Sequence, residues 1–212
     1  MDVAVVVRTV RPWLGTAGIV GIVSVFVSGY LIRTVFDSQP LAVDAAWHDL
    51  LVGNRNPWLE YPSLALNLVG GTIAMILITI AVMAVLFFFR HRWAAAFVGL
   101  SVVLSMLLST IIKQLVDRPR PGDSLVIATS GAFPSGHTTA AAALVVALAL
   151  LFARRWVWAV AAVWVLAMAF SRTYLLAHWL SDTVAGAVLG TSVALLLWAP
   201  VAARLRRRIE AV

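Results

Sequence analysis

Three observations predict an all-α membrane protein with six transmembrane helices. Of the 212 residues 62% are hydrophobic, and the mean hydropathy is +0.98. Only 12% are charged, whereas a soluble domain carries roughly 25%. The apolar residues gather in long runs separated by charged or proline- and glycine-rich segments, which is typical of a chain that crosses a bilayer several times.

Six runs approach the length of about 20 residues that a membrane-spanning helix needs. We expect spans at 14–33, 64–89, 93–116, 136–153, 156–172 and 179–201, all within one domain that covers residues 1–212. The first run is longer than the apolar core of a signal peptide, so we expect it to be retained. It carries small residues suited to close helix packing, namely Gly15, Gly18, Gly21, Ser24, Ser28 and Gly29.

The only long polar connection, residues 33–62, lies between the first two spans. Helical spacing of its apolar residues predicts a short interfacial helix over 41–52, and the sequence at 53–57 predicts a turn. Its aromatic residues Trp47, Trp58 and Tyr61 suit the level of the lipid headgroups. His48 could take part in catalysis, but we interpret it as a solvated surface histidine.

The charges predict the orientation of the chain. One side of the membrane carries only two acidic residues, Asp2 and Glu210, and ten arginines (8, 11, 90, 92, 154, 155, 204, 206, 207 and 208). That side has a net charge of +8 and the opposite side −1, which accounts for the total of +7 without a nucleic-acid partner. The positive-inside rule then places both termini in the cytoplasm and residues 117–135 outside.

A first group of polar residues ends the third span. Lys113 and Arg120 flank a stretch with two prolines, Pro119 and Pro121, which stop the helix and hold the chain extended. Two fixed cations suit a phosphate dianion, and arginine offers a bidentate fork for it. A basic helix end is the alternative, but it would be unusual on the side that should be poor in basic residues.

A second group begins the fourth span. Pro134, Ser135 and Gly136 lead into an alanine-rich helix, whose first backbone N–H groups can bind an anion together with the helix dipole. Gly136 lets a ligand approach the backbone closely. His137 would then touch an oxygen of that anion. An ordinary serine cap beside an incidental histidine is the alternative.

A third group lies between the fifth and sixth spans. His178 and Asp182 are four residues apart and would share a face of a helix, where the carboxylate can hold one imidazole nitrogen and leave the other free. A nucleophilic or basic histidine needs this arrangement. Arg172 lies six residues before His178, so the backbone must break if the two act together. The alternative is a set of polar residues at a membrane interface.

The topology brings all three groups to the outer ends of spans three to six. The chain has no cysteine, and no cluster of carboxylates suggests a metal site, so we expect neither a metal nor another cofactor. Charges at helix ends also disfavour a transporter, in which charged residues would lie within the spans.

The three motifs resemble those of the type 2 phosphatidic acid phosphatase superfamily, the lipid phosphate phosphatases. The family pattern of Lys-x6-Arg-Pro, Pro-Ser-Gly-His and Ser-Arg-x5-His-x3-Asp is matched at every position, from Lys113, Pro134 and Ser171 respectively. The resemblance implies a helical-bundle phosphatase core. It also implies that His178 attacks phosphorus to form a phosphohistidine, that Asp182 orients it, and that His137 acts as general acid and base.

The resemblance further implies which residues bind the phosphoryl oxygens: Lys113, Arg120, Ser135, Gly136 and Arg172. It assigns no role to Arg118 and Asp123, which we consider candidates for headgroup selection. Haloperoxidases share these motifs but are soluble. We expect a lipid phosphate substrate in the cell membrane, with an isoprenoid (undecaprenyl-type) diphosphate favoured because an outward site suits recycling of that carrier. Phosphatidylglycerophosphate and phosphatidic acid are the alternatives.

Overall fold

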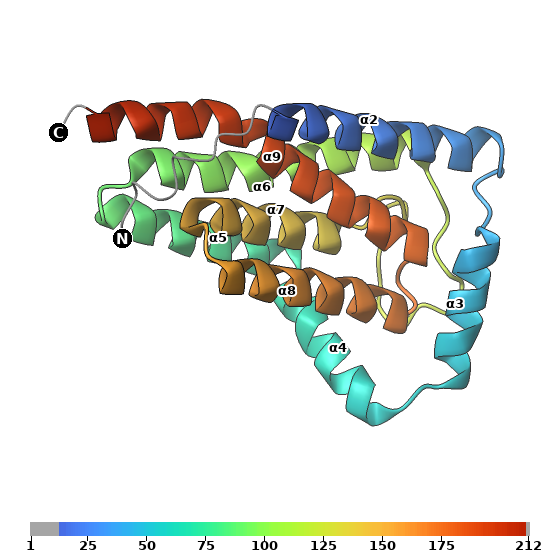
Figure 1. Ribbon diagram of the computed structural model, residues 1–212. Helices are drawn as coiled ribbons and strands as arrows, with labels where there is room; N and C mark the ends of the chain where they lie inside the picture. Colours follow the sequence, from blue (N-terminus) through green and yellow to red (C-terminus); the bar gives the residue numbers. More distant parts are fainter. Residues whose placement is uncertain (1–12, 211–212) are drawn as a thin grey trace.

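A computed structural model describes residues 13–210, with side chains for 13–204, and in this part of the chain it contains helices and no strands (Figure 1). The predicted all-α class is confirmed. Arg8 and Arg11 lie outside the described residues, as do the side chains of Arg206, Arg207 and Arg208. The helices are α2 (Trp13–Thr34), α3 (Ala42–Gly53), α4 (Pro57–Val69), α5 (Thr72–Phe88), α6 (Arg92–Val116), α7 (Gly136–Phe152), α8 (Arg155–Tyr174) and α9 (Leu180–Glu210).

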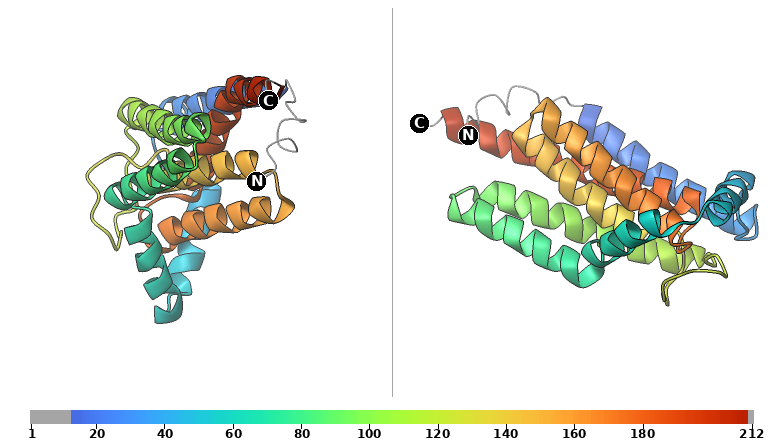
Figure 2. Two further views of the ribbon diagram at one scale, coloured as in Figure 1. Left: turned by 90° about the vertical axis from the view of Figure 1, so that its left-hand side faces the viewer. Right: turned by 90° about the horizontal axis from the view of Figure 1, so that it is seen from below.

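Helices α2, α6, α7, α8 and α9 run side by side along one axis, and α3 lies at one end of the bundle (Figures 1 and 2). Four of the described helices, α2, α6, α8 and α9, are long and apolar enough to cross a bilayer, and α4 with α5 makes a fifth if the pair is one bent span. The protein is therefore a multi-pass membrane protein. Five of the six expected spans begin and end within two residues of a helix, with one exception: α9 continues beyond the sixth span to Glu210. The second span differs and is described below.

Helix α7 forms the centre of the bundle. It has 17 residues, or about 25 Å at 1.5 Å per residue, and most of its side chains are buried among α6, α8 and α9. Its alanines allow α9 to approach closely. A methyl group added at Gly190 of α9 would lie 2.2 Å from the carbonyl oxygen of Thr139, and one added at Gly186 would lie 2.6 Å from that of Ser135.

The small residues of α2 serve the same purpose against α9. Added methyl groups at Gly18 and Gly21 would lie within 2.6 Å and 2.0 Å of atoms of Ser192. At Gly15, in contrast, nothing lies within 4 Å. The predicted packing role therefore holds for Gly18 and Gly21 and not for Gly15.

The second predicted span, 64–89, was wrong as a continuous helix. The structure breaks it at Gly70 and Gly71 into α4 and α5, which meet at an angle of 62°. A side chain at Gly70 would clash with Met168, at 2.7 Å, and with the ring of His137, at 2.9 Å. The break therefore brings this backbone against a residue of the predicted site.

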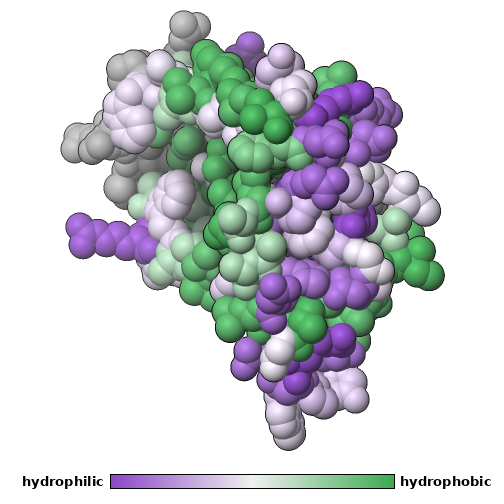
Figure 3. All heavy atoms as spheres, turned by 90° about the vertical axis from the view of Figure 1, so that its right-hand side faces the viewer, coloured by the Kyte–Doolittle hydropathy of each residue, from purple (hydrophilic) through white to green (hydrophobic). Residues whose placement is uncertain are grey.

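The short helix predicted over 41–52 is confirmed as α3, and the predicted turn separates it from α4. Asn56 caps α4 by accepting a hydrogen bond from the Leu59 amide at 3.1 Å, and Pro57 occupies the first helical position. Hydrophilic side chains gather at the end of the bundle where α3 lies, beside hydrophobic ones (Figure 3). The site residues predicted from the sequence come together at this end.

Candidate active site

The three motifs surround one cavity of about 520 Å³. Five of the predicted site residues line it: Lys113, Arg120, Gly136, His137 and His178. Ser135, Arg172 and Asp182 lie behind its wall and are buried. The sequence-based prediction that the ends of α6, α7, α8 and α9 converge agrees with this geometry.

The first motif is shaped by the end of α6. Asp117 adopts a left-handed conformation (φ 46°) and ends the helix. Lys113, in the last turn, donates from Nζ to the Gly131 carbonyl at 2.7 Å, and Arg120 donates from Nε to the Ser130 carbonyl at 2.9 Å. Both cations therefore face the cavity while bonded to backbone carbonyls that also line it.

The second motif begins α7 as predicted. Ser135 is the N-cap residue, yet its side chain forms no capping hydrogen bond with the helix. The Gly136 backbone faces the cavity, and a methyl group added there would make only ordinary contacts of 3.7 Å with Met106 and 3.9 Å with Lys113. This helix start is thus available to an anion in the cavity.

The third motif differs from the expectation in one respect. His178 and Asp182 do not share a helix face, because α8 ends at Tyr174, the chain turns at Leu176 (φ 53°), and α9 begins only at Leu180. The two side chains still face each other, with Nδ1 of His178 3.6 Å from Oδ2 of Asp182. The Trp179 amide donates to the same carboxylate oxygen at 2.9 Å, and Asp182 thus caps its own helix. The break predicted between Arg172 and His178 is confirmed.

The other ring nitrogen of His178 meets Arg120. Its Nε2 lies 3.0 Å from a terminal nitrogen of Arg120. Because a guanidinium can only donate, Nε2 must be the acceptor, and the ring proton is on Nδ1, toward Asp182. Burial, and next to it the positive charges of Arg120 and Lys113, hold the pKa of His178 well below its usual 6.5, so the ring is neutral at pH 7.

Asn67, which sequence reasoning missed, holds two of the predicted site residues. Arg172 donates to its side-chain oxygen at 2.5 Å, and His137 Nε2 lies 3.2 Å from its carbonyl oxygen. Since a carbonyl can only accept, Nε2 of His137 carries the proton. A polar residue near the middle of an otherwise apolar run was the available signal for Asn67.

Arg118 lies outside the cavity, contrary to what a role in headgroup selection would suggest. Its side chain is fully buried between Asp44 and Asp182, at 2.7 Å from each carboxylate. Nothing in the sequence distinguishes Asp44 from the other acidic residues of the 33–62 connection. Asp123 is half-exposed and pairs with His48 at 3.0 Å.

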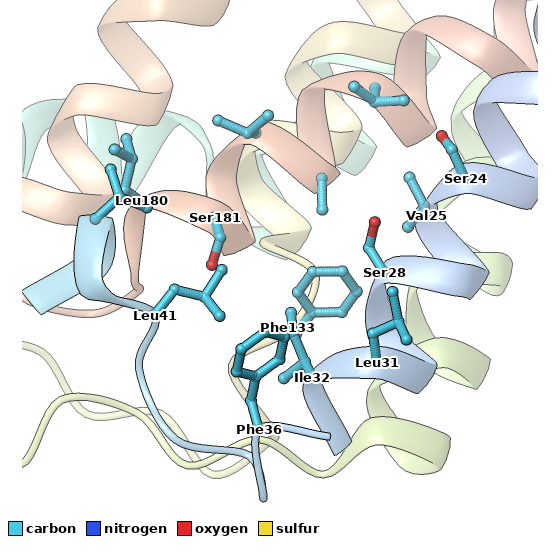
Figure 4. Close-up of a pocket in the computed structure, with 14 residues that line it drawn as sticks. Ser24, Val25, Ser28, Leu31, Ile32, Phe36, Leu41, Phe133, Leu180 and Ser181 are labelled. Carbon is cyan, nitrogen blue, oxygen red and sulfur yellow. The ribbon is translucent and has the colours of Figure 1, made fainter. Parts of the chain in front are cut away.

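A second cavity, of about 490 Å³, lies among the halves of α2 and α9 that are nearest α3 and the segment that leads into α3 (Figure 4). Its lining is almost wholly apolar, and none of the described residues around it is titratable. It shares no described lining residue with the first cavity. The chemistry of the three motifs therefore belongs to the first cavity.

Comparison with known proteins agrees with the motifs. Phosphatidylglycerophosphatase B from Bacillus subtilis is 27% identical over 146 residues, which are 64% of this chain and 72% of that protein. Lipid A 1-phosphatase from Rhizobium johnstonii is 32% identical over 161 residues, which are 70% of this chain and 64% of that protein. Both relatives are named as lipid phosphatases, which confirms the predicted enzyme class.

Two solved structures share the fold. The PAP2-type phosphatidylglycerolphosphate phosphatase from Bacillus subtilis superposes with a TM-score of 0.69 at 23% identity, covering 94% of this chain and 98% of that one. LpxE from Aquifex aeolicus gives a TM-score of 0.66 at 20% identity, covering 74% and 95%. The family model of the PAP2 superfamily matches residues 94–206, more than half of the chain and all three motifs. The chain therefore belongs to the PAP2 superfamily, as its motifs predicted.

Proposed function

We propose that this protein removes a phosphoryl group from a membrane lipid phosphate through a phosphohistidine at His178, without a metal ion. One observation carries the proposal. His178 is held with Nδ1 toward Asp182 and Nε2 toward Arg120, in the wall of a cavity that Lys113 and His137 also line. A neutral imidazole with one nitrogen oriented by a carboxylate and the other turned toward the phosphate-binding cavity is the arrangement that nucleophilic catalysis by histidine requires.

In the first step, Nε2 of His178 attacks phosphorus, and the bond from phosphorus to the leaving oxygen breaks. His137 enters this step as an imidazolium: its Nε2–H stays bonded to the Asn67 carbonyl, and the proton on Nδ1 passes to the leaving oxygen, which leaves the ring neutral. The imidazolium that forms at His178 is stabilised by Asp182, whose carboxylate oxygen is the nearest partner of Nδ1. The 3.6 Å separation is longer than a hydrogen bond, and contacts of this kind commonly shorten in the substrate complex.

In the second step, His137 acts as a base. It takes a proton from water, whose oxygen attacks the phosphohistidine, and the bond between phosphorus and Nε2 breaks. Inorganic phosphate leaves, and His178 returns to its neutral form. The same histidine thus serves both half-reactions, first as acid and then as base.

Positive groups of the protein balance the charge of the transferring phosphoryl group. Lys113 and Arg120 face the cavity, the start of α7 presents its backbone N–H groups, and Arg172 and Ser135 lie directly behind. Phosphoryl transfer depends mainly on positioning and on such electrostatic stabilisation. For Arg172 to reach a phosphate oxygen, its hydrogen bond to Asn67 must be exchanged or shared.

Among lipid phosphates we propose an isoprenoid (undecaprenyl-type) diphosphate at the outer face of the cell membrane, with both termini cytoplasmic. The support is the charge pattern, which places the end of the bundle opposite the arginines outside. Phosphatidylglycerophosphate has equal support, because the Bacillus subtilis relative is named for it. Family membership favours a phosphatase over the transporter alternative.

Phosphate release from a panel of purified lipids tests the substrate proposal. The panel contains undecaprenyl diphosphate, phosphatidylglycerophosphate, phosphatidic acid and a lipid A 1-phosphate, each assayed in excess EDTA. We expect the highest kcat/KM for the isoprenoid diphosphate. A higher value for phosphatidylglycerophosphate would replace that substrate and keep the mechanism, whereas no turnover of any lipid in EDTA, restored by magnesium, would refute the metal-free mechanism.

Two variants test the roles of the histidines. His178→Ala should abolish turnover and the trapping of labelled phosphate on the protein. His137→Ala should cripple turnover yet retain slow phosphorylation of His178, most visibly with a good leaving group. His91→Ala, which alters a histidine that lines neither of the two cavities described above, is the matched control and should keep normal turnover. Trapped phosphate in His178→Ala would overturn the assignment of the nucleophile.

A further inference from the structure

The most completely buried charges in the described part of the chain form a cluster behind the active site. The Arg118 guanidinium donates from one terminal nitrogen to Asp182 Oδ1 and from the other to Asp44 Oδ2, both at 2.7 Å. The side chains of all three residues have no exposed surface. One cation is thus shared between two carboxylates, of which one faces His178.

Asp44 comes from the first turn of α3 and reaches across to α9. Its Oδ1 accepts from the Ser181 amide at 2.8 Å, and its Oδ2 accepts from the Ser181 hydroxyl at 2.8 Å. Ser181 and Leu41, the residue before α3, lie next to one another in Figure 4. Burial alone would raise the pKa of Asp44, but these bonds and the one from Arg118 hold it below its usual value, so the side chain is ionised.

The position of each hydrogen bond matters for Asp182. Arg118 holds Oδ1, so the carboxylate plane is fixed and Oδ2 is left for the Trp179 amide and for His178 Nδ1. The share of the Arg118 charge that Asp44 neutralises is not available to neutralise Asp182. Because Asp44 takes up part of the Arg118 charge, Asp182 is less compensated and can stabilise an imidazolium at His178 more strongly in this low-dielectric interior.

We propose that Asp44 is a positioning residue for catalysis: through Arg118 and Ser181 it fixes the orientation of Asp182 and offsets part of the Arg118 charge that would otherwise compensate this carboxylate, and thereby supports His178 as the nucleophile. This inference rests on the proposed roles of His178 and Asp182. It extends the active site to α3, which precedes the segment, 94–206, that matches the family model.

Replacing Asp44 by Asn removes the charge with little change of shape, and its NH2 group also takes the place of one of the two oxygens that accept hydrogen bonds. Arg118 would then be paired with Asp182 alone, which weakens the pull of that carboxylate on His178. The phosphate-binding groups Lys113 and Arg120 have no bond to Asp44 and are left in place. We therefore expect slower phosphohistidine formation with little change in substrate binding.

The experiment is a single-turnover assay of labelled phosphate on purified full-length protein, with steady-state kinetics alongside. In Asp44→Asn the rate of phosphohistidine formation and kcat should fall by about 10–100-fold, the range typical when an outer-shell partner of a metal-ligating histidine is removed. KM and the inhibition constant for vanadate should stay near the wild-type values. The matched control is Asp49→Asn, which removes the same charge from an exposed side chain of the same helix and should change neither quantity.

Each outcome decides the matter. Wild-type phosphorylation in a folded Asp44→Asn protein overturns the inference, and so does a loss confined to KM. If Asp44→Asn does not fold, Ser181→Ala, which removes the hydroxyl that donates to Asp44 and accepts from Arg118, decides in its place: slower phosphorylation with unchanged vanadate inhibition supports the inference, and an unchanged rate overturns it. Trapped phosphate in His178→Ala would instead refute the proposed function on which the inference rests.

Discussion

Arg172 is a buried cation that lies behind the wall of the cavity. It is 2% exposed, and its guanidinium donates to Asn67. Arg172→Ala should lower kcat/KM by about 10²–10³-fold, as is typical when one donor to the developing charge is removed. Added magnesium should not restore the loss, because in our proposal the charge is balanced by protein groups.

Initial rates in EDTA and in magnesium, for this variant and for Arg172→Lys, check the prediction. Lysine should recover part of the activity, since a point charge cannot reproduce the bidentate fork. Arg55→Ala is the matched control because it removes a partly exposed arginine that pairs only with Glu60 among its described ion pairs. Full activity in Arg172→Ala would exclude this residue from phosphate binding.

At the residue scale, the sequence predicted which residues gather at the site better than it predicted which residues contact one another there. The spacing of His178 and Asp182 correctly indicated that they meet, but for the wrong reason, since no helix turn joins them. Asp44 and Asn67 were not predicted, because their roles depend on contacts with residues 74 and 105 positions away. Such long-range contacts leave no local pattern.

At the scale of elements, the contact between α7 and α9 positions two of the three motifs. The Ser135 amide donates to the Asp182 carbonyl at 2.9 Å, so the starts of both helices are joined. Gly190→Ala would place a methyl group 2.2 Å from a backbone oxygen of α7. Overpacking of this kind costs about 1–3 kcal/mol, so we expect a lower melting temperature together with reduced turnover.

Thermal unfolding in detergent, followed by loss of the helical circular dichroism signal, measures this effect. Gly15→Ala is the control, because nothing lies within 4 Å of the added methyl group and alanine favours a helix over glycine. An unchanged melting temperature in Gly190→Ala would show that the two helices can move apart freely.

The sequence predicted most elements because apolar runs and proline or glycine boundaries are local features. It failed at 64–89, where hydropathy continues through Gly70 and Gly71 while the backbone turns. Two glycines within a span permit a break but do not require one. The close approach of Gly70 to His137 and Met168 shows what the glycine at this break allows, and only the assembled bundle reveals it.

At the scale of the whole molecule, the charge pattern predicts that the site faces outward. Single-cysteine labelling tests this directly, since the chain contains no cysteine of its own. A cysteine at the half-exposed position 123 should react with an impermeant maleimide in intact cells. A cysteine at the exposed position 154 should react only after permeabilisation. The reverse pattern would invert the orientation and remove the support for an outward-facing substrate.

The contact between Arg120 and His178 has a consequence for the resting enzyme. In our proposal the Nε2 lone pair of His178 attacks phosphorus, and in this structure it already accepts a hydrogen bond from the Arg120 guanidinium. The nucleophile is therefore masked, and it becomes free when an anion draws the arginine away. An uncharged electrophile cannot do this, so the idle site is protected from side reactions.

Arg120→Gln should consequently change two reactivities in opposite directions. Phosphatase activity should fall, because a phosphate-binding cation is lost, while carbethoxylation of His178 by diethylpyrocarbonate should become faster than in the wild type. Modification of His178 alone, followed by mass spectrometry of the peptide that contains it, separates the two effects. Equal rates of modification in both proteins would mean that Arg120 only binds substrate; a faster rate in the variant would show that the same side chain also keeps the nucleophile in check between turnovers.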